Sequence, residues 1–182
     1  MNPNIKITTI ILDVDGTLYR FPSGSFATSE LKQAVLKNAQ KYISEKLEVS
    51  EKQAQKLLDD IAQTDGENIS TALEKRHGLD RYDYFNTVWD LPAEQFVKVD
   101  PAVAQTLQGL SESYTLILLS DAPMVWMKKI VSLLGADDII VEHNMYSGES
   151  DTRKIFGNAF TSIVKKNKVA PQECVAVGDQ ET

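Results

Sequence analysis

The sequence has few of the residues that several common kinds of protein chemistry need. Its one cysteine, Cys174, cannot form a disulfide within the chain and suits a reducing compartment. Its two histidines, His77 and His143, show no zinc-ligand spacing with each other or with Cys174. No run of 18 apolar residues is present, and the N-terminus lacks the pattern of a signal peptide. We therefore expect a cytoplasmic protein without zinc.

Positive charge is also scarce. The chain has 26 acidic and 19 basic residues and a formal net charge of −7, and no basic stripe offsets this. Such a balance argues against a nucleic-acid polymer or an anionic membrane as the partner. A phosphorylated ligand would have to be held by local cations. The length of 182 residues and the hydrophobic fraction of 42% fit one globular core with a small appendage.

The most informative segment is Asp13-Val14-Asp15-Gly16-Thr17, which follows the apolar run 10–12. An apolar strand is buried, and its carboxyl end is where open α/β sheets bind ligands. Asp13 and Asp15 share one side of an extended segment, and Gly16 allows a sharp turn or the close approach of a ligand. A hard cation such as Mg²⁺ relieves the repulsion between such carboxylates. The alternative is an Asp-Gly turn whose second Asp caps the next element.

The second half of the chain alternates helix and strand patterns. We expect strands at 5–12, 114–119, about 138–142 and 174–177, with helices starting at Asp100-Pro101 and near Pro123, and another at about 156–167. This alternation predicts an α/β fold with a doubly wound parallel sheet.

Only helices are expected between residues 26 and 90. Apolar residues recur at helical spacing over 31–47, and Ser50 with Gln53 forms a capping box that begins a second helix. Asp65-Gly66 ends that helix, and further helices are expected at 68–77 and about 82–89. We therefore expect a core domain formed by 1–18 and 98–182. The helical insertion, 19–97, emerges beside the two aspartates and is a candidate lid.

Polar residues follow the other expected strands. Ser120-Asp121 ends the strand 114–119 and precedes a helix, so its alternative role is a helix N-cap. Lys154 stands near a helix start, where a cation opposes the helix dipole. Gly178-Asp179 brings a third carboxylate to the same sheet edge, although it could also be a plain turn.

Taken together, the order and spacing of these segments resemble the four motifs of the haloacid dehalogenase superfamily. Most members are Mg²⁺-dependent phosphatases that act on small phosphorylated metabolites. The resemblance implies that Asp13 is the nucleophile and Asp15 a general acid and base, which favours a phosphatase over a dehalogenase. It also implies phosphate binding by Ser120, with neighbouring Asp121, and by Lys154. Mg²⁺ would be held by Asp13, the Asp15 carbonyl and Asp179.

Within the superfamily, Leu18-Tyr19 and Leu91-Pro92 resemble the pyrimidine 5′-nucleotidase group, as does the helical insertion, which looks like that group's cap. This implies nucleoside 5′-monophosphates as substrates, with Tyr19, Asp65 and Asn68 as candidate contacts from the cap, and a monomer or homodimer. The alternatives are a sugar-phosphate phosphatase or a phosphoglucomutase-like enzyme, and an inactive, truncated homologue that acts as a binding module.

The sequence also departs from the family pattern. Asp121 stands where relatives usually have Asn, which adds negative charge near the expected phosphate, and Ile155 stands where Pro is usual. The chain ends at Thr182, before the second acidic residue of motif four. We therefore expect a C-terminus truncated within motif four and a sheet that lacks an edge strand.

Overall fold

The computed structural model describes residues 6–66, 68–149, 154 and 157–179. The chain divides into two compact units. One consists of Met1–Phe26 and Pro92–Thr182, and the other of Ala27–Leu91. Sequence reasoning drew the boundaries at 18 and 98, whereas residues 19–26 and 92–97 here belong with the first unit.

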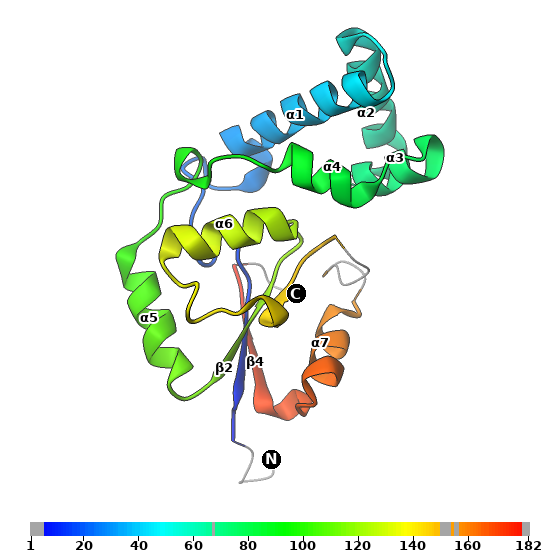
Figure 1. Cartoon of the computed structure of the whole chain (residues 1–182). Coiled ribbons are helices and arrows are strands. Elements are labelled where there is room, and N and C mark those ends of the chain that lie inside the picture. Colours follow the sequence, from blue (N-terminus) through cyan, green and yellow to red (C-terminus); the bar gives the residue numbers. More distant parts are fainter. Residues whose placement is uncertain (1–5, 67, 150–153, 155–156, 180–182) are drawn as a thin grey trace. The chain divides into compact units, whose positions relative to one another are not determined.

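The first unit is built on a four-stranded parallel sheet with the order β3-β2-β1-β4 (Figure 1). The strands are β1 (Thr9–Leu12), β2 (Thr115–Leu119), β3 (Met145–Tyr146) and β4 (Cys174–Val177). Thr9 of β1 lies opposite Thr115 on one side and Cys174 on the other, so β1 is an inner strand. This confirms the predicted α/β fold with a parallel sheet, and the β4 bounds match the expected 174–177.

Helices cover the sheet of this unit. They are α5 (Pro101–Ser111), α6 (Met124–Leu134) and α7 (Ala159–Asn167). Side chains alternate between the two faces of a strand, and Ile11, Ile117 and Leu119 pack against Ala159 and Ile163 of α7. Helices α5 and α6 lie on the other side of the sheet (Figure 1). Both faces are therefore shielded, as a parallel sheet requires.

Short 3₁₀ helices link several of these elements. They are η1 (Phe26–Thr28), η2 (Ala93–Gln95), η3 (Glu142–Asn144) and η5 (Pro171–Glu173). The start of α5 follows from its sequence, because Pro101 occupies the first turn and the Asp100 side chain accepts a hydrogen bond from the Ala102 backbone N–H.

The second unit contains the helices α1 (Glu30–Lys46), α2 (Glu51–Asp65), α3 (Ile69–His77) and α4 (Arg81–Val88). Its described residues include no strand, as expected. The predicted capping box is present, since Ser50 and Gln53 satisfy each other's backbone N–H groups at the start of α2. Gly78 ends α3 with a φ of 68°, a conformation that glycine adopts without strain. Among the described residues, no helix combines the length and apolar character needed to cross a membrane.

One predicted strand was wrong. The apolar residues at 139–141 suggested a strand at about 138–142, but residues 137–139 form a turn, and the Ile140 N–H donates to Ala136 O at 2.9 Å. The actual strand, β3, is formed by Met145 and Tyr146, which pair with Leu118 and Leu119. The expected helix at 156–167 begins at Ala159, and residues 155 and 156 lie outside the described residues.

A polar cluster in the second unit makes a testable contribution to stability. Asp83 accepts a hydrogen bond from the Tyr42 hydroxyl at 2.9 Å and lies 2.7 Å from the Lys46 ammonium. The hydrogen bonds from Lys46 and then Tyr42 hold the pKa of Asp83 below its usual value. A carboxylate with a lowered folded-state pKa stabilises the fold above its unfolded pKa, and this stabilisation is lost as the pH falls through the folded value.

We predict that Asp83→Asn lowers the free energy of unfolding by about 1 kcal/mol at pH 7, a small effect because the pair is partly exposed. The difference from the unmodified chain should shrink as the pH falls below about 4. Circular dichroism during thermal or urea unfolding would measure this difference in unfolding free energy. Lys46→Met, which removes the other member of the ion pair, is the matched variant. A difference that stays constant between pH 7 and pH 3 would show that the Asp83 carboxylate does not stabilise the fold through its charge.

Candidate functional site

The candidate site begins where β1 ends. The Asp13 N–H still pairs with Val177 O of β4 at 2.9 Å, and the chain then turns, with the Leu18 N–H donating to Val14 O at 3.0 Å. Val14 is fully buried, and Gly16 adopts a φ of 84°. The glycine is required here because other residues adopt this conformation only with strain. The turn leaves Asp13 and Asp15 on the carboxyl side of the sheet.

Asp13 is paired with the candidate phosphate-binding lysine. The Lys154 ammonium lies 2.5 Å from Asp13 Oδ1, and the two side chains are only 23% and 11% exposed, respectively. The Val14 N–H donates to the same oxygen at 2.7 Å. Burial raises the pKa of Asp13, and the hydrogen bond and charge of Lys154 oppose that shift. The structure thus brings together two residues that lie 141 positions apart in the sequence.

Asp15 is held by two hydroxyl groups. The Ser120 hydroxyl donates to Asp15 Oδ2 at 2.6 Å, and the Tyr19 hydroxyl donates to Asp15 Oδ1. Ser120 is fully buried and also accepts a hydrogen bond from the Ala122 N–H at 3.0 Å. The alternative role of Ser120 as the N-cap of α6 is not observed, because Pro123 occupies that position.

Gly178 and Asp179 lie against the same turn. A Cβ atom added to Gly16 would come within 2.2 Å of Asp179 Oδ2, and one added to Gly178 would come within 3.6 Å of Asp13 Oδ2. The Asp179 carboxylate therefore occupies the space that the missing Gly16 side chain leaves open. The ends of β1 and β4 thus bring Asp13 and Asp179 to the same edge of the sheet.

The oxygen donors at this edge of the sheet bear on whether it could hold a metal ion. Within the described residues, no group of three or more His, Cys, Asp and Glu side chains is arranged to hold a metal. The expected site needs fewer side chains, because Asp13 and Asp179 would supply carboxylates and Asp15 a backbone carbonyl. These are hard oxygen donors, and Mg²⁺ takes such ligands from one or two carboxylates while it keeps water molecules. The residues present therefore fit Mg²⁺.

Asp121 has a defined partner within the protein. Its Oδ1 accepts a hydrogen bond from the Lys154 backbone N–H at 2.9 Å, although the residue is exposed. The carboxylate that carries the extra negative charge noted in the sequence therefore binds the Lys154 backbone. Gly148 packs so closely on Asp121 that an added Cβ would lie 2.1 Å from Asp121 O. A direct contact between Asp121 and phosphate stays a prediction.

The three candidate substrate contacts do not lie in one unit. Tyr19 was expected in the cap, but it belongs to the sheet unit, is only 3% exposed and uses its hydroxyl on Asp15. Asp65 and Asn68 belong to the helical unit, where Asp65 pairs with Arg76 and Asn68 Nδ2 donates to Asp65 O at 3.0 Å. Their contact with a substrate stays a prediction.

Sequence reasoning assigned no role to two residues, one outside the motifs and one within the first motif. Trp126 of α6 is fully buried, and its indole N–H donates to the Tyr19 hydroxyl at 3.2 Å. The 107 positions between them leave no local pattern that could have indicated this contact. Thr17 Oγ1, in contrast, lies within the first motif and is one of the buried polar side-chain atoms in the described residues that have no hydrogen-bond partner.

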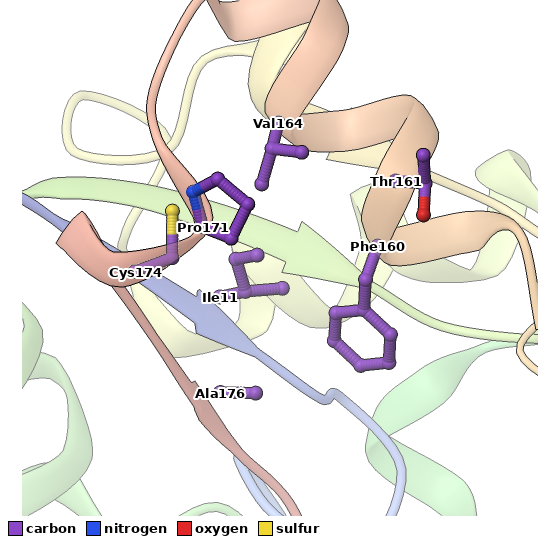
Figure 2. A pocket seen from close by; sticks show the side chains of 7 residues that line it. All are labelled: Ile11, Phe160, Thr161, Val164, Pro171, Cys174 and Ala176. Carbon is purple, nitrogen blue, oxygen red and sulfur yellow. The ribbon is translucent and has the colours of Figure 1, made fainter.

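An apolar pocket of about 260 Å³ lies elsewhere in the same unit. Figure 2 shows the side chains that line it, which come from β1, β4, α7 and the segment before β4: Ile11, Phe160, Thr161, Val164, Pro171, Cys174 and Ala176. Burial raises the pKa of the Cys174 thiol, so the thiol stays protonated at neutral pH. None of the lining residues is Asp13, Asp15, Lys154 or Asp179, so this pocket lies apart from the candidate site.

Comparison with solved structures supports the fold. A haloacid dehalogenase-like hydrolase from Streptococcus pneumoniae aligns with a TM-score of 0.53 at 16% identity, covering 96% of this chain and 77% of that one. An enzyme of the same family from Bacteroides thetaiotaomicron aligns with a TM-score of 0.56 at 15% identity, covering 97% and 86%. The wild-type form of the latter, solved with magnesium and inorganic phosphate, aligns with a TM-score of 0.53 at 16% identity, covering 96% and 86%.

At these identities the structural likeness shows the fold alone, and no match was found among curated proteins. The family model for haloacid dehalogenase-like hydrolases, in contrast, matches residues 7–182, which is nearly the whole chain and includes every candidate site residue. The chain therefore belongs to the haloacid dehalogenase-like hydrolase family.

Proposed function

We propose that this protein is a Mg²⁺-dependent phosphatase that hydrolyses small phosphomonoesters through an aspartyl-phosphate intermediate. The observation that carries the proposal is the convergence of Asp13, Asp15 and Lys154 at one sheet edge. Asp13 pairs with Lys154 at 2.5 Å, and Asp15 lies two residues further on with both carboxylate oxygens hydrogen-bonded. Phosphate-monoester hydrolysis needs on the order of 20 kcal/mol of barrier lowering, so several such groups must act together.

The residues divide the reaction into two steps. In the first, an oxygen of Asp13 attacks phosphorus while the bond to the leaving oxygen breaks, and protonated Asp15 gives its proton to that oxygen. In the second, Asp15 takes a proton from water as the water oxygen attacks the aspartyl-phosphate, which returns Asp13 as a carboxylate and releases inorganic phosphate.

Other groups stabilise the charge of the phosphoryl group. We assign Lys154 and Ser120 to the phosphoryl oxygens, because both already lie against the two aspartates. Asp13, Asp179 and the Asp15 carbonyl would hold Mg²⁺, which supplies positive charge to neutralise phosphoryl oxygens. The solved relative from Bacteroides thetaiotaomicron, whose structure contains magnesium and inorganic phosphate, supports this assignment.

The substrate class is proposed more narrowly as nucleoside 5′-monophosphates. The support is the resemblance of Leu18-Tyr19 and of the helical unit to the pyrimidine 5′-nucleotidase group. We propose the helical unit as a cap that excludes water and selects the leaving group, with Asp65 and Asn68 as contacts.

The single cysteine supports a cytoplasmic location, and the acidic net charge of −7 supports a small-molecule substrate over a nucleic-acid polymer.

The first prediction from this proposal concerns Asp13. Phosphate release should be measured with nucleoside monophosphates, sugar phosphates and p-nitrophenyl phosphate, with and without Mg²⁺. Turnover should require Mg²⁺, and Asp13→Asn should lower it by at least about 1,000-fold because the variant lacks the nucleophile. Asp59→Asn, an exposed aspartate in α2, is the matched control and should keep full activity. No turnover by the folded, unmodified chain would contradict the phosphatase, and fastest hydrolysis of sugar phosphates would contradict the nucleotidase.

The second prediction concerns Gly16. Because an added Cβ would collide with Asp179 Oδ2, Gly16→Ala should displace this carboxylate and raise the Mg²⁺ concentration for half-maximal activity by about 10-fold. Gly24→Ala is the matched control, since Gly24 also has a positive φ of 92° but has nothing within 4 Å of the added atom. Both variants carry backbone strain, but only the first should change the Mg²⁺ requirement. Equal Mg²⁺ requirements would show that Asp179 takes no part in metal binding.

A further inference from the structure

We propose that Tyr19 is a positioning residue that holds the Asp15 carboxylate in the orientation for proton transfer, and that Trp126 fixes the direction of the Tyr19 hydroxyl. The proposal deepens the proposed phosphatase function and rests on it. All three residues belong to the sheet unit. The contacts that carry the proposal are the hydrogen bonds from Tyr19 to Asp15 and from Trp126 to Tyr19.

The direction of each hydrogen bond follows from the donor groups. An indole N–H can only donate, so Trp126 Nε1 donates to the Tyr19 oxygen at 3.2 Å. The Tyr19 proton is then available for Asp15 Oδ1. A phenol is protonated at neutral pH, so the Tyr19 hydroxyl remains a donor.

Ser120 forms a similar arrangement on the other carboxylate oxygen. The Ala122 N–H donates to Ser120 Oγ at 3.0 Å, and the Ser120 hydroxyl donates to Asp15 Oδ2 at 2.6 Å. Because the terminal torsion of an aspartate is broad, a single hydrogen bond would leave the carboxylate free to rotate. In the free protein, two hydroxyl groups on different oxygens fix its plane. When Ser120 turns its single proton to a phosphoryl oxygen, Tyr19 remains as the donor that holds Asp15.

The Tyr19 ring is itself held in place. It is 3% exposed and packs edge-on against Phe21, with ring centroids 5.1 Å apart and an interplanar angle of 79°. Trp126, which anchors its hydroxyl, is fully buried in α6. A buried ring with an anchored hydroxyl presents its donor at a fixed position, which a flexible or solvated side chain would not do.

This positioning has a chemical consequence that can be measured. Asp15 must place its proton on the leaving oxygen as the bond from phosphorus to that oxygen breaks and the bond to Asp13 forms. An alkoxide leaving group needs this proton, whereas p-nitrophenolate is stable enough to leave without it. Misplacing Asp15 should therefore slow the hydrolysis of an alkyl phosphate more than that of p-nitrophenyl phosphate.

The test compares Tyr19→Phe, which removes only the hydroxyl, with the unmodified chain on both kinds of ester. We expect kcat/KM, which reports the step in which the leaving group departs, to fall about 10-fold more for an alkyl phosphate, such as a nucleoside 5′-monophosphate, than for p-nitrophenyl phosphate. Trp126→Phe should show the same selectivity with a smaller loss. Tyr42→Phe, which removes another Tyr–Asp hydrogen bond in the helical unit, is the matched control and should leave both rates unchanged. Equal losses on both esters by Tyr19→Phe would assign Tyr19 a merely structural role and overturn the proposal.

A second measurement needs no activity and separates this proposal from the proposed function. In a double-mutant cycle, the unfolding free energies of Tyr19→Phe, Asp15→Ala and the double variant reveal whether the two side chains interact. We expect non-additive effects. Additive effects would overturn the contact even if the chain is a phosphatase. Non-additive effects in a chain that hydrolyses no ester would contradict the proposed function and its catalytic use of Tyr19, while the contact itself would stand.

Discussion

Repulsion among carboxylates at the carboxyl edge of one sheet is the constraint on which the rest of the site depends. Asp13 and Asp15 leave the end of β1, and Asp179 approaches them from the end of β4. Each acid is accommodated differently. Asp13 pairs with Lys154, Asp15 accepts hydrogen bonds from two hydroxyl groups, and Asp179 fits where Gly16 has no side chain. Different surroundings give similar side chains different chemical roles.

The parallel sheet makes this convergence possible. Because β1 is flanked by β2 and β4, the residues that follow these strands meet at one edge. Ser120 follows β2 and Gly178-Asp179 follows β4. The same arrangement couples the site to the core, since Trp126 of α6 is fully buried and contacts Tyr19. The site is thus supported by the packed sheet unit and not by loops alone.

Sequence reasoning predicted the structural features that depend on residues close together in the chain. The capping box at Ser50 and Gln53, the glycine at the end of α3 and the bounds of β4 all agree with the structure. These features depend on residues a few positions apart. The short strand β3 was missed because it exists through pairing with β2, whereas the apolar residues at 139–141 gave a misleading local signal.

In the candidate site, too, the motif residues were predicted from the sequence, whereas contacts between distant residues outside the motifs were not. The motifs predicted that Lys154 belongs near Asp13, and the ion pair at 2.5 Å agrees with that placement. The contact between Trp126 and Tyr19 could not be predicted, because only the packing of α6 against the turn after β1 creates it. The sequence predicted only that Asp121 adds charge near phosphate. Its hydrogen bond from the Lys154 N–H joins two residues that lie 33 positions apart, which no local pattern indicates.

The central claim is that Asp13 carries the phosphoryl group during turnover. The most direct test is to stop the reaction with acid while a phosphomonoester is being hydrolysed in the presence of Mg²⁺, and to locate the added phosphoryl mass by peptide mass spectrometry. The account predicts an acyl phosphate on Asp13 that is lost when the quenched protein is treated with hydroxylamine. Phosphate release with the added phosphoryl mass on a residue other than Asp13 would contradict this claim.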